Sequence, residues 1–156
     1  MDLAVLSDWW TRHSGAKADA IQYGAMPYQI VDGRVVYLLI TSRRTGRWIF
    51  PKGGLIEGMT PQQSAAQEAF EEAGVRGTVE PTPLGTYQTV KHRISRKLID
   101  VQVFALRVEE RLDAWPEMEQ RRRHWVLFGE AKRLLSDRGA VEAARRLNKR
   151  TAGADA

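Results

Sequence analysis

The sequence contains no cysteine, and this absence removes several classes of function at once. Without a thiol, the chain has no disulfide framework, no zinc site with thiolate ligands and no cysteine nucleophile. The absence also fits a reducing compartment. We therefore expect a cytoplasmic location.

Long apolar runs are missing as well. No stretch approaches the roughly 20 apolar residues that span a bilayer, so we expect no membrane partner. The first ten residues, MDLAVLSDWW, carry no basic segment ahead of their apolar residues, which argues against a secretory signal. A chain of 156 residues with 43% apolar content is long enough for one domain with a substantial core.

We predict a single domain over residues 21–150, with an N-terminal extension over residues 1–20 and a tail over residues 151–156. Two apolar stretches flank Asp32-Gly33 and predict a β-hairpin. Further strands are predicted at residues 48–50, 77–92, 96–108 and 121–128, and further helices at residues 129–136 and 140–149. Ala140, Val141, Ala144 and Leu147 are expected on the inner face of the last helix.

Positive charge exceeds negative charge, and the formal net charge is +5. The positive residues occur in three clusters: Arg43, Arg44 and Arg47; Lys91, His92, Arg93, Arg96 and Lys97; and Arg121, Arg122 and Arg123. Clusters of this kind suit an anionic partner, either nucleic acid or a phosphate-rich small molecule, although solubility alone also explains them.

Residues 51–75, PKGGLIEGMTPQQSAAQEAFEEAGV, contain the signals of one amphipathic helix. Thr60 is placed to cap its N-terminus, with Pro61 at the first helical position and Gln63 completing a capping box. Gly74 is placed to end it. Apolar residues at helical spacing predict the buried face, which consists of Ala66, Ala69, Phe70 and Ala73.

Three glutamates crowd the opposite face of this helix: Glu68, Glu71 and Glu72. Like charges one turn apart destabilise a helix by about 0.2–0.5 kcal/mol per pair, so the arrangement calls for a compensating cation. Carboxylate oxygens are the ligands that hard divalent cations prefer. Taken alone, however, such a pattern is more often a solvated acidic surface.

The glycine turn and the acidic helix together resemble the Nudix box, written Gly-x5-Glu-x7-Arg-Glu-x2-Glu-Glu-x-Gly and followed by an apolar residue. With Gly53 as the first position, the matching residues are Glu68, Glu71, Glu72, Gly74 and Val75. The similarity continues through GRWIFPKGG, EEAGVRG and RRRHWV, and it covers residues 22–147. These segments resemble the diphosphoinositol polyphosphate phosphohydrolase group of Nudix hydrolases, which also cleave diadenosine polyphosphates.

Two positions depart from the Nudix pattern. Met59 stands where the pattern has its first glutamate, and Gln67 stands where it has arginine. Glu57, two residues before Met59, is either a substitute for the missing acid or an ordinary turn residue. Gln67 is expected to orient Glu71 by a hydrogen bond, which is weaker than one from a charged guanidinium.

The resemblance implies an α/β (α+β) fold, with a mixed central sheet between helices in an αβα sandwich. It also implies a divalent metal, Mg²⁺ or alternatively Mn²⁺. The candidate ligands are Glu68, Glu71, Glu72 and the backbone carbonyl of Lys52. Glu68 and Glu72 are the candidate catalytic residues, and Glu68 is either a ligand or the base that takes a proton from the attacking water. Glu117 and Glu119 lie in a loop where related enzymes often place a further acid.

The substrate-binding candidates are Arg43, Arg44, Lys52, Gly53, Gly54 and Arg93. The paired glycines allow the backbone to approach metal and phosphate, and the basic residues suit a polyanion. We therefore predict a Mg²⁺-dependent Nudix pyrophosphohydrolase that cleaves a phosphoanhydride bond of a highly phosphorylated small molecule. A diphosphoinositol polyphosphate or a dinucleoside polyphosphate fits this description.

Two other functions are left open. One is hydrolysis of a different nucleoside diphosphate derivative, such as a nucleotide sugar. The other is a weakly active Nudix fold that binds RNA or a nucleotide through its excess positive charge, and nucleic acid is the less favoured partner. The sequence pattern does not indicate an oligomeric state.

Overall fold

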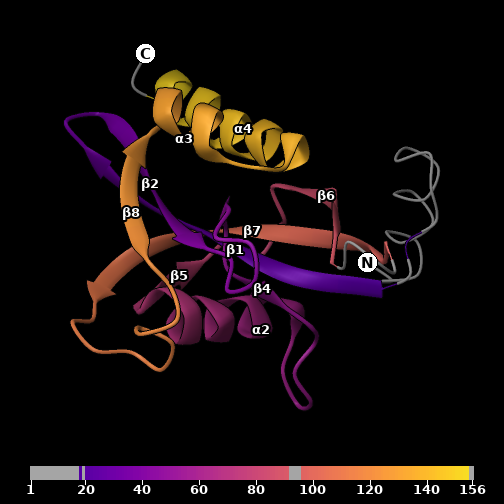
Figure 1. Cartoon of the computed structure of the whole chain (residues 1–156). Coiled ribbons are helices and arrows are strands. Elements are labelled where there is room, and N and C mark those ends of the chain that lie inside the picture. Colours follow the sequence, from indigo (N-terminus) through magenta and orange to yellow (C-terminus); the bar gives the residue numbers. More distant parts are fainter. Residues whose placement is uncertain (1–17, 19, 92–95, 155–156) are drawn as a thin grey trace.

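The computed structural model describes residues 18, 20–91 and 96–154, so the predicted N-terminal extension lies almost wholly outside the described residues. One mixed sheet lies between two helical layers (Figure 1). The helices are α2 (Pro61–Glu68), η1 (Ala69–Ala73), α3 (Phe128–Leu134) and α4 (Arg138–Ala154). The first two cover one face of the sheet and the last two cover the other, which confirms the αβα prediction. None of these helices is long and apolar enough to cross a membrane.

Within the described residues, the sheet contains eight strands, with the central order β3-β2-β1-β7-β5. The strands are β1 (Ala20–Val31), β2 (Arg34–Thr41), β3 (Trp48–Ile49), β4 (Lys52–Gly53), β5 (Val75–Val79), β6 (Gly85–Val90), β7 (Leu98–Arg111) and β8 (Arg123–Leu127). β1 and β7 pair in parallel at the centre, and the other pairs are antiparallel. β4 pairs with β1, which fixes the Lys52-Gly53 turn against the middle of the sheet.

The predicted hairpin is present between β1 and β2. Tyr28 lies opposite Tyr37, and the turn residues Asp32 and Gly33 have φ values of 50° and 75°. Two consecutive left-handed residues match the twist of the flanking strands. The segment 77–92, by contrast, divides into β5 and β6, because its middle contains two prolines that cannot donate to a β-ladder.

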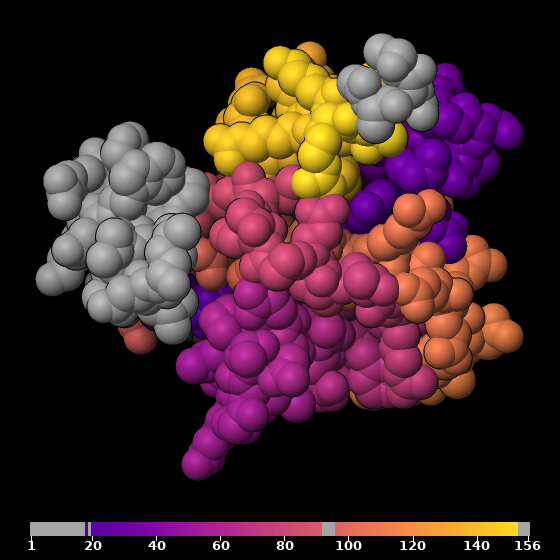
Figure 2. Space-filling view, turned by 180° about the vertical axis from the view of Figure 1, so that it is seen from behind, coloured from indigo at the N-terminus to yellow at the C-terminus, as the bar shows by residue number. Residues whose placement is uncertain are grey.

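Each face of the sheet carries its own apolar core. The predicted inner residues of the last helix are confirmed, since Ala140, Val141, Ala144 and Leu147 are each at most 2% exposed. The helix continues to Ala154, past the predicted boundary at residue 150. Figure 2 shows α4 in yellow and the magenta residues of α2 on opposite sides of the strands. The smaller core under α2 and η1 contains Ala65, Ala69 and Ala73.

Candidate functional site

The acidic helix begins and ends where the sequence predicts. The Thr60 hydroxyl accepts a hydrogen bond from the Gln63 N–H at 3.1 Å, and the Gln63 side chain accepts one from the Thr60 N–H at 2.9 Å. Gly74 ends the helix with φ 66°. The sequence did not indicate that the final turn, η1, is a π-helix. Such widened turns are rare and occur often at functional sites, and this one carries Glu71 and Glu72.

The prediction of the buried face was wrong for two of its four residues. Ala66 and Phe70 are only partly buried, whereas Ala65, Ala69 and Ala73 are fully buried. A spacing of four residues exceeds the 3.6 residues of an α-helical turn, and the widened final turn keeps Ala73 in line with the other two. The small side chains in this line allow the helix to pack closely on the sheet.

The three glutamates do not form the solvated acidic surface that the helix pattern taken alone allowed. Glu72 is 6% exposed, and Glu68 and Glu71 are partly buried. Glu72 Oε2 accepts the backbone N–H of Lys52 at 3.0 Å, and Oε1 accepts Nη2 of Arg121 at 2.8 Å. Burial raises the pKa of Glu72 to about 7, while Arg121 acts in the opposite direction.

Glu68 lies against the glycine turn. A β-carbon on Gly53 would come within 2.4 Å of Glu68 Oε1, so only glycine leaves this carboxylate in place. Burial, with repulsion from Glu71, raises the pKa of Glu68 to about 7. Glu71 itself accepts the predicted hydrogen bond from Gln67, at 3.0 Å. The glutamates are thus held in place by the strand, the glycine turn and the helix itself.

The donor set fits a hard divalent cation in its chemistry. All the candidate ligands offer oxygen, and repulsion from Glu71 raises the pKa of Glu68, while repulsion from Glu68 raises the pKa of Glu72. Within residues 18, 20–91 and 96–154, however, no three acidic or imidazole side chains converge closely enough to hold a metal as they stand. The cationic partner of Glu72 in the structure is the guanidinium of Arg121.

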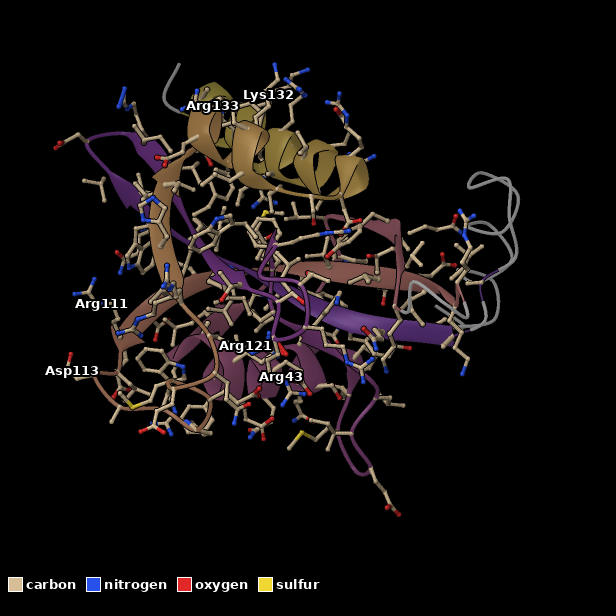
Figure 3. All side chains as sticks on the ribbon, in the orientation of Figure 1. Arg43, Arg111, Asp113, Arg121, Lys132 and Arg133 are labelled. Carbon is tan, nitrogen blue, oxygen red and sulfur yellow. The ribbon has the colours of Figure 1, made fainter. Side chains whose placement is uncertain are left out.

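A cleft of about 1650 Å³ opens beside Glu72. Its basic lining residues are Arg43, Arg44, Arg47, Lys52, Lys91, Arg96 and Arg121. Gly53 and Gly54 line it as well. Figure 3 shows Arg43 and Arg121 together beside α2, and both form ion pairs with Glu117. The cleft therefore contains every predicted substrate-binding residue except Arg93, which lies outside the described residues.

Asp137 is a cleft residue that sequence reasoning missed. It lies between α3 and α4. Burial raises the pKa of its carboxyl group, while a hydrogen bond with Thr89 lowers this pKa by a smaller amount. Burial lowers the pKa of Lys52, while Glu72 and Asp137 both oppose that shift. Both carboxylates thus favour the charged form of the Lys52 side chain. The only signal in the sequence was an Asp directly before a helix, which usually indicates a cap.

The segment between β7 and β8 closes the end of the acidic helix, and this too was missed. Four consecutive carbonyls, from Glu71 to Gly74, accept hydrogen bonds from this segment and from Arg123, the first residue of β8. The donors, in that order, are the Glu117 N–H, Trp115 Nε1, Arg123 Nη1 and the Leu112 N–H, at 3.0, 3.2, 3.1 and 2.8 Å. This segment satisfies the groups that a helix end leaves unpaired.

The cluster Arg121, Arg122 and Arg123 is therefore not simply a surface for an anionic partner. Arg121 and Arg123 are bound inside the protein, and Arg123 also stacks on Trp115 at 3.9 Å. Arg122 is exposed. Of the remaining acids, Glu117 forms an ion pair with Arg121, which in turn binds Glu72. Glu57 and Glu119 are exposed in their loops.

Comparisons with known proteins identify the family of the chain. The NUDIX domain model matches residues 28–147. Nudix hydrolase 4 of Arabidopsis thaliana is 35% identical over 131 residues, which cover 77% of this chain and 62% of that protein. Diphosphoinositol polyphosphate phosphohydrolase 3-alpha of Mus musculus is 34% identical over 110 residues, which cover 69% of this chain and 64% of that protein.

The structural similarity shows the same fold. A C. elegans Ap4A hydrolase, solved as a binary complex, aligns with a TM-score of 0.67 and 20% identity, covering 85% of this chain and 98% of that one. The chain spans less than two thirds of the length of Nudix hydrolase 4 and of the mouse protein. The matched domain, the fold and the acidic helix together show that this chain belongs to the Nudix hydrolase family.

Proposed function

We propose that the protein is a Mg²⁺-dependent pyrophosphohydrolase acting on a highly phosphorylated small molecule, such as a diphosphoinositol polyphosphate or a dinucleoside polyphosphate. One observation carries the proposal: the buried carboxylate of Glu72 opens onto a cleft lined by seven basic side chains. A carboxylate site suits a divalent cation, and the basic walls suit a ligand with more negative charge than one cation neutralises.

The proposed metal ligands are Glu68, Glu71, Glu72 and the backbone carbonyl of Lys52, and Mn²⁺ is the alternative ion. When bound, such an ion neutralises charge on the phosphate oxygens and makes water nucleophilic near neutral pH. Gly53 leaves space for the Glu68 carboxylate beside the turn. Of the proposed ligands, Lys52 on β4 and Glu72 on η1 line the cleft.

Glu68 is the proposed general base. Its pKa of about 7 lets it accept a proton from the attacking water and release it again near neutral pH. Glu72, held by the Lys52 N–H and by Arg121, has a fixed orientation and is the better candidate for a ligand.

The basic walls define the proposed substrate class. Arg43, Arg44 and Arg47 lie on one wall, in the segment after β2, while Lys91 and Arg96 flank the β6–β7 turn. A chain of several phosphates, or a pyrophosphorylated polyol, offers enough charge to engage both walls. The mouse relative and the C. elegans protein are named for substrates of this kind, which supports the proposal.

The test is turnover of a substrate panel with and without Mg²⁺. The panel contains a diphosphoinositol polyphosphate, diadenosine tetraphosphate, a nucleotide sugar and a short RNA. We expect Mg²⁺-dependent release of phosphate or nucleotide from the first two. Preferential cleavage of the nucleotide sugar would overturn the substrate class. Tight RNA binding without any turnover would overturn the proposal of an enzyme.

A further inference from the structure

The acidic helix, meaning α2 and η1 together, contains three glutamates and neither lysine nor arginine. The Nudix pattern has an arginine at the position of Gln67, and here the neutral amide donates to Glu71 at 3.0 Å. An amide orients a carboxylate but does not offset its charge. Any balancing charge from the protein must therefore come from another segment.

Arg121, in the segment between β7 and β8, provides that charge. Its Nη2 lies 2.8 Å from Glu72 Oε1, its Nε lies 3.2 Å from Glu117 Oε1, and its Nη1 donates to the Thr41 carbonyl at 3.1 Å. The three nitrogens of the planar fork thus each have a different partner, and the side chain is only 7% exposed. Such contacts hold a guanidinium in a single orientation.

The segment that carries Arg121 is attached to the same helix end. It donates to the Glu71 carbonyl through the Glu117 N–H at 3.0 Å, and to the Glu72 carbonyl through Trp115 Nε1 at 3.2 Å. The backbone and the side chain of Glu72 are therefore held by one segment. This double attachment fixes the distance between the guanidinium and the carboxylate.

We propose that Arg121 is a positioning residue, which orients Glu72 and balances the charge of the acidic helix in place of the arginine that the helix lacks. The proposal rests on the proposed function, because Glu72 is a proposed metal ligand. It has a distinctive consequence. Arg121 and a divalent cation share one carboxylate, so removing Arg121 lowers the repulsion against the cation while it releases Glu72 from its orientation.

The experiment compares Arg121→Gln with Arg122→Gln, which removes the same charge from the exposed neighbour. Mn²⁺ binding is measured by electron paramagnetic resonance, and kcat and KM are measured at saturating Mg²⁺, well below the Tm of each variant. For Arg121→Gln we expect kcat to fall at least 30-fold, KM to stay within about threefold, and the Mn²⁺ dissociation constant to stay level or fall. Arg122→Gln should match the wild type in all three.

Two further variants test separately whether Arg121 orients Glu72 and whether it replaces the charge of the missing helix arginine. Arg121→Lys keeps the charge and loses the planar fork, so we expect wild-type Mn²⁺ affinity with a reduced kcat. It also gives a result if Arg121→Gln does not fold. Gln67→Arg, added to Arg121→Gln, returns a cation to the helix and should recover at least fivefold in kcat.

Three results would overturn the inference. A parallel loss of kcat and Mn²⁺ affinity in Arg121→Gln and Arg121→Lys would assign Arg121 a purely structural role. An unchanged kcat in both variants would show that Arg121 has no role at the site. If Gln67→Arg recovers no activity, Arg121 does not stand in for the arginine that the acidic helix lacks. A wild-type protein that binds Mn²⁺ but hydrolyses no substrate would refute the proposed function instead, and the Mn²⁺ affinities of the variants would still distinguish the roles of Arg121.

Discussion

The α-carbon of Gly53 faces the Glu68 carboxylate so closely that a β-carbon there would lie 2.4 Å from Oε1 and 2.9 Å from Oε2. The next glycine, Gly54, faces open space. Gly53 is not in the left-handed region of φ, so the backbone does not demand glycine at this position. Glycine is needed at this position because a β-carbon would overlap the Glu68 carboxylate.

Gly53→Ala should therefore impair activity far more than folding. The added methyl group displaces the end of a flexible side chain, and we expect the free energy of unfolding to change by less than about 1 kcal/mol. Displacing a reacting carboxylate by about 1 Å lowers turnover by roughly 100-fold. Urea unfolding and steady-state kinetics measure the two effects. Gly54→Ala is the matched comparison, because a β-carbon at Gly54 meets no atom within 4 Å, and it should lose far less turnover than Gly53→Ala.

A large loss of stability in Gly53→Ala, or equal losses of turnover in both alanine variants, would contradict this assignment of Gly53. The first result would mean that the backbone needs glycine at the turn. The second would mean that the whole turn, rather than the Glu68 carboxylate, determines activity.

The pH dependence of stability should report on Glu68 in the metal-free protein. Burial raises its pKa from 4.5 to about 7, so the folded protein binds this proton more tightly than the unfolded chain does. The contribution to stability is present below pH 4.5 and is lost as the pH rises to about 7. Thermal unfolding in chelator should therefore show the Tm falling across this window, relative to Glu68→Gln.

Added Mg²⁺ should remove this decline in the wild type, because the cation stabilises the ionised carboxylates. A difference in Tm between wild type and Glu68→Gln that stays constant from pH 4.5 to pH 7.5 would show that Glu68 has an ordinary pKa. Its assignment as a general base would then lose its physical basis.

Substrate selection should depend on the basic walls of the cleft. Replacing Arg44 and Arg96 with alanine removes two charges from separate segments that line the cleft, and each charged contact contributes about 1.5–3 kcal/mol. We expect KM to rise at least tenfold for diadenosine tetraphosphate and far less for a nucleotide sugar. Raising the salt concentration should weaken binding of the former more steeply. Equal losses on both substrates would argue against a polyphosphate.

Arg107→Ala is the control for this comparison. Arg107 is exposed on β7, outside the cleft lining, so its removal changes the net charge without changing the walls. If KM for diadenosine tetraphosphate rises as much in this variant as in the cleft variants, the effect comes from overall charge rather than from local contacts.

Local signals in the sequence were sufficient for the hairpin and for the limits of the acidic helix. Asp32-Gly33 and the Thr60 capping box act through neighbouring backbone groups, so their structures follow from adjacent residues. The resemblance to the Nudix box placed Glu68, Glu71 and Glu72 together in the same way. These features needed no knowledge of the rest of the chain.

The long-range contacts of the site could not be predicted in this way. The sequence predicted Glu72 as a metal ligand, but it did not indicate that Arg121, 49 positions away, lies 2.8 Å from its carboxylate. Arg121 and Arg123 look alike in a run of three arginines, yet one binds a carboxylate and the other binds carbonyls. The fold assigns these roles, because only tertiary packing determines which donors meet the helix end.

The central claim is that Glu72 belongs to a Mg²⁺-dependent hydrolytic centre, and Glu72→Gln tests it most directly. The amide keeps the shape of the side chain, and Arg121 retains Glu117 and the Thr41 carbonyl, so the variant should fold with a lowered Tm. The measurement is hydrolysis of diadenosine tetraphosphate and of a diphosphoinositol polyphosphate at saturating Mg²⁺, at a temperature where circular dichroism shows the variant folded. We predict turnover in the wild type and at least a 1,000-fold loss in Glu72→Gln, whereas near-wild-type turnover in the folded variant would contradict the account.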